Sequence, residues 1–169
     1  IPASSGHLKI SGPVNIYFQI FVRNLNTHDK KPKNFCYKKR ERNPICPGKR
    51  GNYIDQVFDL MSGPEYEEII YVDDHDYLLE ATTSNICIFD KSNQTFYFPR
   101  EREEIFEGLT EKYVRRALEN MNLNIDDKSF KIEEMDSDKN IIFFNSVSLL
   151  SCGYNQDMEP FDIDFLKRI

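Results

Sequence analysis

Residues 80–86 decide the fold, and they read Glu80-Ala81-Thr82-Thr83-Ser84-Asn85-Ile86. Apolar residues precede and follow this stretch, which predicts a strand on each side, over 77–80 and 85–89. The hydroxyl and amide side chains between them favour a turn, because they can hydrogen-bond to nearby backbone groups. The carboxylate of Glu80 is then expected at a strand end beside a polar turn. An ordinary exposed glutamate at that position is the alternative.

Other apolar runs predict the rest of a sheet. Strands are expected at 14–22 (VNIYFQIFV), 68–72 (EIIYV), 95–98, 125–132, 140–144 (NIIFF) and 148–152. Residues 90–93 have the composition of a hairpin connection. Residues 23–48 are instead polar, basic and interrupted by Pro32, Pro44 and Pro47, which predicts a long loop.

Two helices are expected outside these strands. The first begins near Tyr53, repeats apolar residues at helical spacing up to Met61, and ends at Ser62-Gly63-Pro64. The second begins with Thr110 as N-cap and presents one apolar face: Val114, Ala117, Leu118 and Met121. Residues 165–169 have a weaker helical pattern.

Size and charge limit the classes of function. A chain of 169 residues and 20.0 kDa can bury one core, and the formal net charge of −6 argues against a nucleic-acid binder. The basic residues between 30 and 50 form either a solvated loop or an electrostatic funnel for an anionic substrate. No apolar run is long enough to span a bilayer, so we expect no membrane partner and a cytoplasmic location.

Metal binding is not expected. Cys36, Cys46, Cys87 and Cys152 show no CxxC spacing, and His7, His28 and His75 have no clustered partners.

Three further segments carry groups that could serve such a site. They are Lys49-Arg50-Gly51-Asn52-Tyr53, Glu107-Gly108-Leu109-Thr110 and Phe144-Asn145-Ser146. They offer a primary amine, a Gly-x-Thr turn that opens a helix, and a polar turn after an apolar strand. Taken alone, each has a plain structural interpretation: a surface lysine, an N-cap and a strand-ending turn.

In this order, the four segments resemble the large domain of the class IV (fold type IV) pyridoxal-phosphate enzymes. That group includes branched-chain and D-amino-acid aminotransferases and 4-amino-4-deoxychorismate lyase. The match runs from Lys49 to about Tyr154, and its most specific parts are Glu80-x-x-x-Ser84-Asn85-Ile86 and Gly108-Leu109-Thr110. The resemblance implies an α+β fold in which a barrel-like β-sheet has helices at its flanks, with pyridoxal 5'-phosphate as cofactor.

The resemblance also implies roles for the amine and the acid. Lys49 would carry the cofactor as a Schiff base, which needs a primary amine that is partly neutral. Glu80 would face the pyridine nitrogen and keep it protonated, so that the ring can accept electrons. Tyr53 would pack beside the cofactor, although a core tyrosine on the helix face is an equal alternative.

The remaining residues would hold the phosphate. Gly108, Leu109 and Thr110 open a helix whose N–H groups and partial positive charge favour an anion. Ser146 matches the second hydroxyl near the phosphate, preceded by Asn145. One departure stands at Glu111, where the family commonly has arginine. The Asn-Ser pair is more similar to the lyase branch than to the aminotransferases.

We therefore expect residues 1–48 to form a strand and basic loop that lead into a cofactor-binding large domain at 49–169, without the small N-terminal domain of the family. The implied function is 4-amino-4-deoxychorismate lyase, which gives 4-aminobenzoate and pyruvate for folate synthesis. A class IV aminotransferase and a non-catalytic interaction domain are the alternatives. The implied partners are a small-molecule substrate and a second copy in a homodimer.

Overall fold

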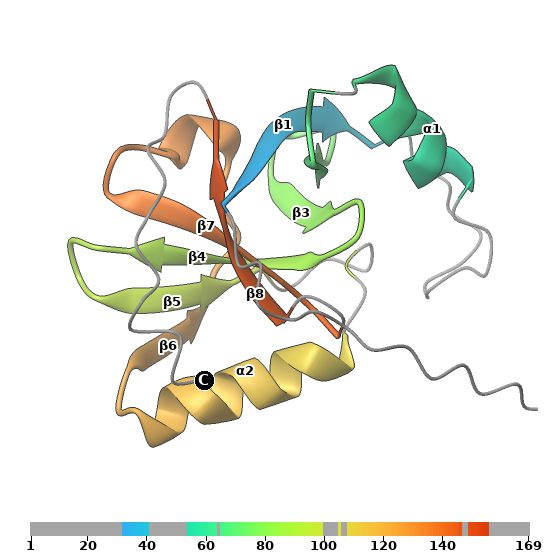
Figure 1. Ribbon diagram of the computed structural model, residues 1–169. Coiled ribbons are helices and arrows are strands. Elements are labelled where there is room, and N and C mark those ends of the chain that lie inside the picture. The colour runs from blue at the N-terminus through green and yellow to red at the C-terminus, as the bar shows by residue number, and fades with distance from the viewer. Residues whose placement is uncertain are drawn as a thin grey trace, which may run out of the picture.

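The fold is a curled eight-stranded sheet with two helices, seen in a computed structural model that describes residues 32–40, 54–63, 65–99, 105, 108–146 and 149–155 (Figure 1). The order of strands in the sheet is β3-β2-β1-β8-β7-β4-β5-β6. The strands are β1 (Lys33–Lys39), β2 (Glu68–Val72), β3 (Leu78–Ala81), β4 (Asn85–Asp90), β5 (Thr95–Phe98), β6 (Asn124–Asp127), β7 (Lys139–Asn145) and β8 (Leu149–Tyr154). The expected strand at 14–22 and helix at 165–169 lie outside the described residues.

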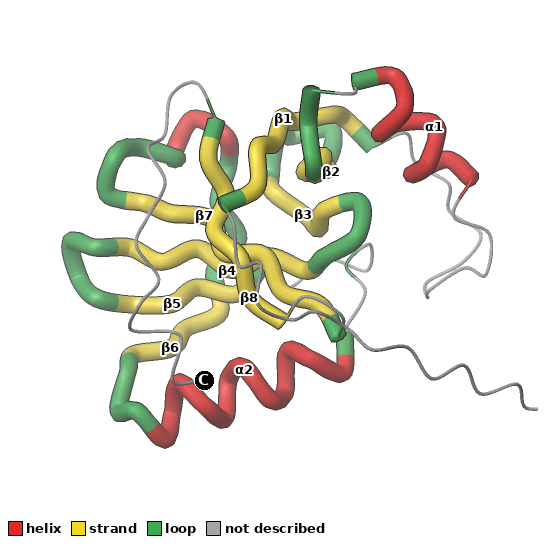
Figure 2. Tube along the Cα trace, viewed as in Figure 1, coloured by secondary structure: helices red, strands yellow, loops and turns green. Residues whose placement is uncertain are grey.

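The sheet is mixed. β1 runs parallel to both β2 and β8, and β5 runs parallel to β6. The other pairs are antiparallel: β2 with β3, β4 with both β5 and β7, and β7 with β8. Its curl brings β1, β2 and β3 around beside β4 and β7, as the strands in Figure 2 show. The barrel-like sheet expected from the sequence is confirmed.

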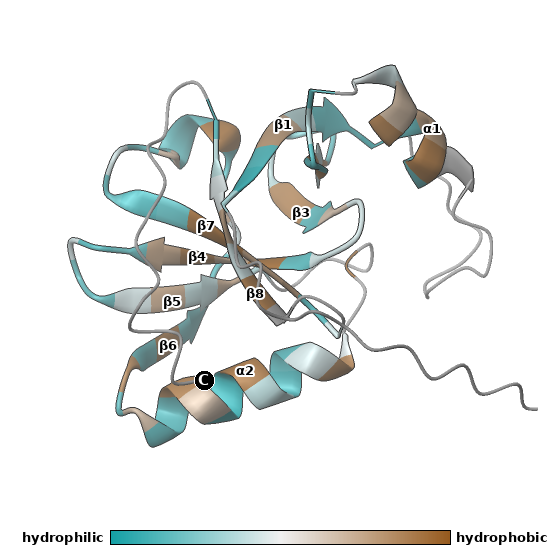
Figure 3. Ribbon diagram, in the orientation of Figure 1, coloured by the Kyte–Doolittle hydropathy of each residue, from teal (hydrophilic) through white to brown (hydrophobic). Residues whose placement is uncertain are grey.

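Apolar side chains fill both faces of this sheet, because its central strands alternate between two clusters. Along β7, Ile141 and Phe143 join the cluster inside the curl, whereas Ile142 and Phe144 join the cluster under helix α2. Brown covers much of β4 and the middle of β7 in Figure 3, and the turn between β4 and β5 is teal. The apolar runs therefore produce strands that are buried on both faces.

Helix α2 (Leu109–Asn120) lies across one face of the sheet and contributes Val114 and Leu118 to the core. The apolar face expected from its sequence is confirmed for these two residues. Its N-cap is Gly108 rather than Thr110, which lies inside the first turn, so that prediction was wrong. Serine and threonine are common N-caps, but the N-cap residue must also have a non-helical backbone. Gly108 meets this condition, with extended backbone angles of φ −75° and ψ 145°.

Helix α1 (Ile54–Ser62) lies at the outer side of β1 and β2. Leu60 packs there against Ile69 and Tyr71, while Phe58 and Met61 remain exposed. No helix within the described ranges is both long and apolar enough to cross a membrane.

Residues 23–48 were expected to form a loop, and that prediction was wrong for Lys33–Lys39. Strand β1 lies within them and occupies the middle of the sheet. Phe35 is buried inside the curl, while the lysines at its end, Lys38 and Lys39, pair with acidic residues from elsewhere in the chain. These acidic partners satisfy the charges that made the segment resemble a solvated loop.

The strand expected at 125–132 was too long. β6 ends at Asp127, and Ile132–Glu134 form a short 3-10 helix. Between them, Phe130 is buried in the core, where the centroid of its ring lies 5.2 Å from the ring centroid of Tyr97. Phe130 thus belongs to the cluster inside the curl, whereas the strand itself ends three residues earlier.

Candidate functional site

Three of the four sequence segments meet at the turn between β3 and β4. The turn comprises Thr82, Thr83 and Ser84, and Glu80 comes two residues before it, on β3. Asn145, at the end of β7, reaches it with its amide: Nδ2 donates to the Thr83 carbonyl oxygen over 3.3 Å and to Ser84 Oγ over 3.0 Å. The amide therefore ties the end of β7 to the polar turn. Ser146 follows directly and is exposed.

The start of helix α2 lies against the same turn. A Cβ atom placed on Gly108 would lie only 2.5 Å from Oδ1 of Asn85, the first residue of β4. The backbone of Gly108 has no positive φ, so a larger residue here is disfavoured only by the close approach to the Asn85 side chain, which would have to move. The helix has no side-chain hydrogen bond at its N-cap. Leu109 is 77% exposed and Thr110 is half-buried, so the first helical turn borders solvent.

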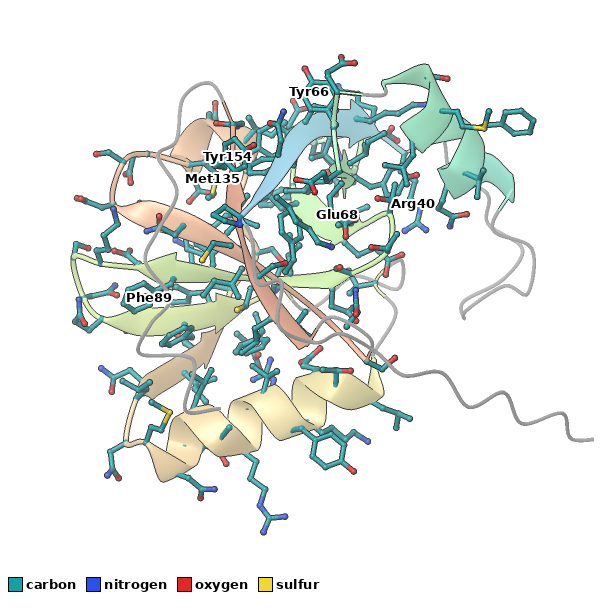
Figure 4. All side chains as sticks on the ribbon, viewed as in Figure 1. Arg40, Tyr66, Glu68, Phe89, Met135 and Tyr154 are labelled. Carbon is teal, nitrogen blue, oxygen red and sulfur yellow. The ribbon has the colours of Figure 1, made fainter. Side chains whose placement is uncertain are left out.

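A buried carboxylate that the sequence analysis missed organises the turn. Glu68 is 0% exposed. Its Oε1 accepts hydrogen bonds from Lys33 Nζ and Ser84 Oγ, both at 2.8 Å, and a short one from Thr83 Oγ1. Its Oε2 accepts from Thr82 Oγ1 at 2.7 Å and from the Thr83 backbone N–H at 2.9 Å. Figure 4 shows Glu68 within the curl of the sheet, beside β3.

These donors keep Glu68 ionised. Burial by itself raises the pKa of a carboxyl group. Here the charge and hydrogen bond of Lys33 and the hydroxyls of Thr83 and Thr82 outweigh burial, so the pKa of Glu68 lies below its usual value. The run Thr82-Thr83-Ser84 could have indicated a nearby buried acceptor, because three adjacent hydroxyl groups at a turn need hydrogen-bond acceptors. Nothing in the local sequence assigns them to Glu68.

Glu80 is held from another direction. Arg40, just after β1, donates from Nη1 to Glu80 Oε1 over 2.9 Å. The Arg40 guanidinium also lies over the ring of Tyr71, with Cζ 5.2 Å from the ring centroid. Tyr71 in turn donates from its hydroxyl to Asp59 on helix α1 over 2.9 Å. These contacts connect Glu80 to β1, β2 and α1.

Glu111 stands where the class IV pyridoxal-phosphate enzymes commonly have arginine, and it is paired within its own helix. Its Oε1 accepts from Nε of Arg115 over 2.8 Å, and both side chains are mostly buried. Arg115 also binds Asp127 and lies with Cζ 3.9 Å from the ring centroid of Phe98. The negative charge of Glu111 is therefore compensated close to the start of α2.

The described residues fit a phosphorylated pyridine ligand. They combine a carboxylate at Glu80, a helix start at Gly108 that a side chain would obstruct, and a hydroxyl at Ser146. Lys49 and Tyr53 lie outside the described residues, so the amine remains a prediction. Within the described part of the chain, no group of three or more His, Cys, Asp and Glu side chains could hold a metal ion.

Comparison with known proteins identifies relatives in sequence and in fold. The family model described as amino-transferase class IV matches residues 5–151, so the match begins well before Lys49 and includes β1. Comparison with curated proteins found no match.

Three solved structures illustrate the similarity of fold. A candidate 4-amino-4-deoxychorismate lyase from Legionella pneumophila has a TM-score of 0.73 at 16% identity, over 89% of this chain and 57% of that one. A branched-chain aminotransferase from Thermoproteus uzoniensis, solved with norvaline, has a TM-score of 0.71 at 14% identity, over 84% and 50%. A hypothetical aminotransferase from Mycobacterium tuberculosis in a PLP-bound form has a TM-score of 0.69 at 14% identity, over 83% and 52%. The chain thus spans about half the length of these proteins, and identities this low show the fold alone.

Proposed function

The chain belongs to the class IV aminotransferase family, and from this premise we propose that it binds pyridoxal 5'-phosphate and acts as a 4-amino-4-deoxychorismate lyase, giving 4-aminobenzoate and pyruvate. The observation that carries the proposal is the meeting of three predicted segments at one turn. Glu80 precedes the turn, Asn145 binds it, and Gly108 lies against the residue that follows it.

Each residue has a proposed role in holding the cofactor. Glu80 is the partner of the pyridine nitrogen, and the N–H groups at Gly108, Leu109 and Thr110 bind the phosphate together with the hydroxyl of Ser146. Asn145 holds the turn that follows Glu80, through its hydrogen bonds to Thr83 and Ser84. When bound, the cofactor supplies an electron sink for the carbon that loses a proton.

Lys49 remains the predicted amine that binds the cofactor aldehyde. The free amine of Lys49 would be the base that takes a proton from the substrate and later returns one. A lysine suits both tasks when its neutral form is accessible near neutral pH.

Lyase activity is favoured over transamination by Asn145 and Ser146. The pair is similar to the lyase branch of the family, and Asn145 does more than end a strand, because its amide bonds to Thr83 and Ser84. A class IV aminotransferase is the second candidate, supported by the family model that matches residues 5–151.

Reduction with borohydride tests the cofactor and the lysine together. Purified protein is incubated with pyridoxal phosphate, reduced and digested, and mass spectrometry identifies the peptide that retains the cofactor. The proposal predicts the cofactor on Lys49, an absorbance band near visible wavelengths, and loss of both in Lys49→Ala. Lys39→Ala is the matched control, because Lys39 is 63% exposed and pairs with Asp76. A protein without the band would fit a non-catalytic interaction domain.

Product analysis separates the two activities. Aminodeoxychorismate is supplied without a keto acid, and pyruvate is measured with lactate dehydrogenase. Release of pyruvate under these conditions supports the lyase, whereas turnover that depends on an added keto acid identifies an aminotransferase. Light scattering on the same sample tests the proposed homodimer.

A further inference from the structure

Glu80, the proposed partner of the ring nitrogen, is bound by a cation from a different strand. Arg40 Nη1 lies 2.9 Å from Glu80 Oε1, within hydrogen-bonding distance. The Arg40 and Glu80 side chains are only 29% and 15% exposed, so the pair is partly shielded from water. Partial burial distinguishes this pair from surface ion pairs, which are free to rearrange.

Arg40 is itself held in place. Its backbone N–H donates to the carbonyl oxygen of Val72 over 2.9 Å, which fixes the chain where β1 ends. Its guanidinium lies over the ring of Tyr71, and Tyr71 is 5% exposed. The Tyr71 hydroxyl is anchored on helix α1 by Asp59. Figure 4 shows Arg40 on the side of the sheet that faces α1.

This arrangement restricts the orientation of one carboxylate. A guanidinium is planar and donates in fixed directions, so an arginine held on an aromatic ring restricts the rotation of the acid that it binds. A lysine is a flexible point charge and lacks this directional constraint. Glu80 is therefore oriented before any ligand arrives, and preorganisation of this kind reduces the entropic cost of binding.

We propose that Arg40 is a positioning residue, which holds the Glu80 carboxylate in the orientation that meets the pyridine nitrogen of the cofactor. This inference rests on the proposed cofactor site, and it adds a residue to that site. Arg40 acts through Glu80 and is not assigned a contact with the cofactor. Tyr71 supports it by holding the plane of the guanidinium.

The test uses pyridoxal phosphate labelled with ¹⁵N at the ring nitrogen, bound to the full chain. The ¹⁵N resonance reports protonation of that nitrogen, and titration gives the dissociation constant. In Arg40→Met we expect the resonance to move toward its unprotonated position and the dissociation constant to rise about tenfold, by analogy with the loss of an outer partner at a metal site. Arg40→Lys should give intermediate values for both.

Lys39→Met is the matched control, because it removes a neighbouring positive charge that pairs with Asp76 at 3.2 Å rather than with Glu80. It should leave the resonance and the affinity at the wild-type values. Thermal unfolding of each apo protein verifies that the variants fold. Should Arg40→Met fail to fold, Arg40→Lys carries the comparison.

The outcomes separate this inference from the proposed function. Wild-type protein that binds the labelled cofactor, together with an Arg40→Met protein of equal affinity and unchanged resonance, would overturn the role of Arg40 and leave the proposed function intact. Wild-type protein that binds no labelled cofactor would overturn the proposed function and this inference with it. A shift in Arg40→Met equal to that in Lys39→Met would indicate a general charge effect and also overturn the inference.

Discussion

The ammonium group of Lys33 lies 2.8 Å from the fully buried carboxylate of Glu68, and this ion pair joins β1 to β2. The carboxylate accepts further hydrogen bonds from the turn that follows β3. The pair therefore connects the strand that the sequence analysis missed to the turn at which the candidate site is built.

Removal of Lys33 should destabilise the protein strongly. Lys33→Met leaves the buried carboxylate of Glu68 without its cation, and breaking a buried pair in this way costs about 3 kcal/mol. Lys39→Met breaks an exposed pair and should change the free energy of unfolding by less than about 1 kcal/mol. Urea denaturation of both proteins checks this, and equal effects would contradict a structural role for the Lys33–Glu68 pair.

The same carboxylate predicts a pH dependence. The pKa of Glu68 is lower in the folded protein than its usual value of 4.5, because its donors outweigh burial. Its contribution to stability is therefore complete above the unfolded pKa and is lost as the pH falls below it. Glu68→Gln should lack this part of the acid-induced loss. Urea midpoints of the two proteins between neutral pH and the acid range measure the difference, and parallel curves would refute the prediction.

Tyr71 predicts a dependence of opposite sign. Burial, followed by the hydrogen bond to Asp59 and its charge, raises the pKa of Tyr71 above its usual 10.0. A raised pKa on this acid stabilises the fold below the unfolded pKa, and the contribution is lost as the pH rises above it. Tyr71→Phe should lose about 1 kcal/mol at neutral pH, the value of one hydrogen bond. Above pH 10 its stability should fall less steeply than that of the wild type, as measured by urea midpoints.

Arg115 should matter to anion binding although it lies one helical turn away from Glu111. Arg115→Met leaves the mostly buried charge of Glu111 uncompensated near the start of α2. We expect weaker binding of pyridoxal phosphate, and a stability loss of about 3 kcal/mol. The exposed Arg116 provides the matched control, Arg116→Met. Adding Glu111→Gln to Arg115→Met should restore the affinity, as measured by fluorescence titration, and failure to do so would show that Glu111 is irrelevant.

Gly108 tests the contact between α2 and β4. Gly108→Ala introduces a Cβ atom 2.5 Å from Asn85 Oδ1, so the amide must move. The backbone tolerates alanine at φ −75°, and overpacking here should cost about 1 kcal/mol. Asn85→Ala should remove the collision, so the double variant is expected to be more stable than the sum of the single effects predicts. Strict additivity in urea denaturation would show that the contact has no energetic role.

Much of the sheet could be predicted because its central strands are apolar on both faces. β4, β5 and β7 appear where runs such as NICIFD and KNIIFFN occur, and the turn between β3 and β4 was evident from its hydroxyl residues. β1 was missed because its sequence, KNFCYKK, has few apolar residues. Its lysines are satisfied by Glu68, Asp59 and Asp76, which are distant in sequence.

The candidate site was predictable only in part for the same reason. Gly108 and Asn145 were identified from local motifs, and the structure places both beside the turn that follows Glu80. Arg40 was one of many basic residues in its segment, and spacing alone does not select it. Glu68 was identified only as the first residue of a short strand, with no role assigned to it. Pairing across the sheet assigns both residues, and no local pattern encodes that pairing.

The position of β1 also determines when the nascent protein can finish folding. Lys33 and Asn34 pair with Gly153 and Tyr154, near the opposite end of the described sequence. During synthesis, that side of β1 must wait until Gly153 and Tyr154 have left the ribosome, and such distant contacts form slowly. Until then an unsatisfied strand edge is open to other unfinished chains, so chaperones that shield nascent polypeptides should raise the yield of this protein.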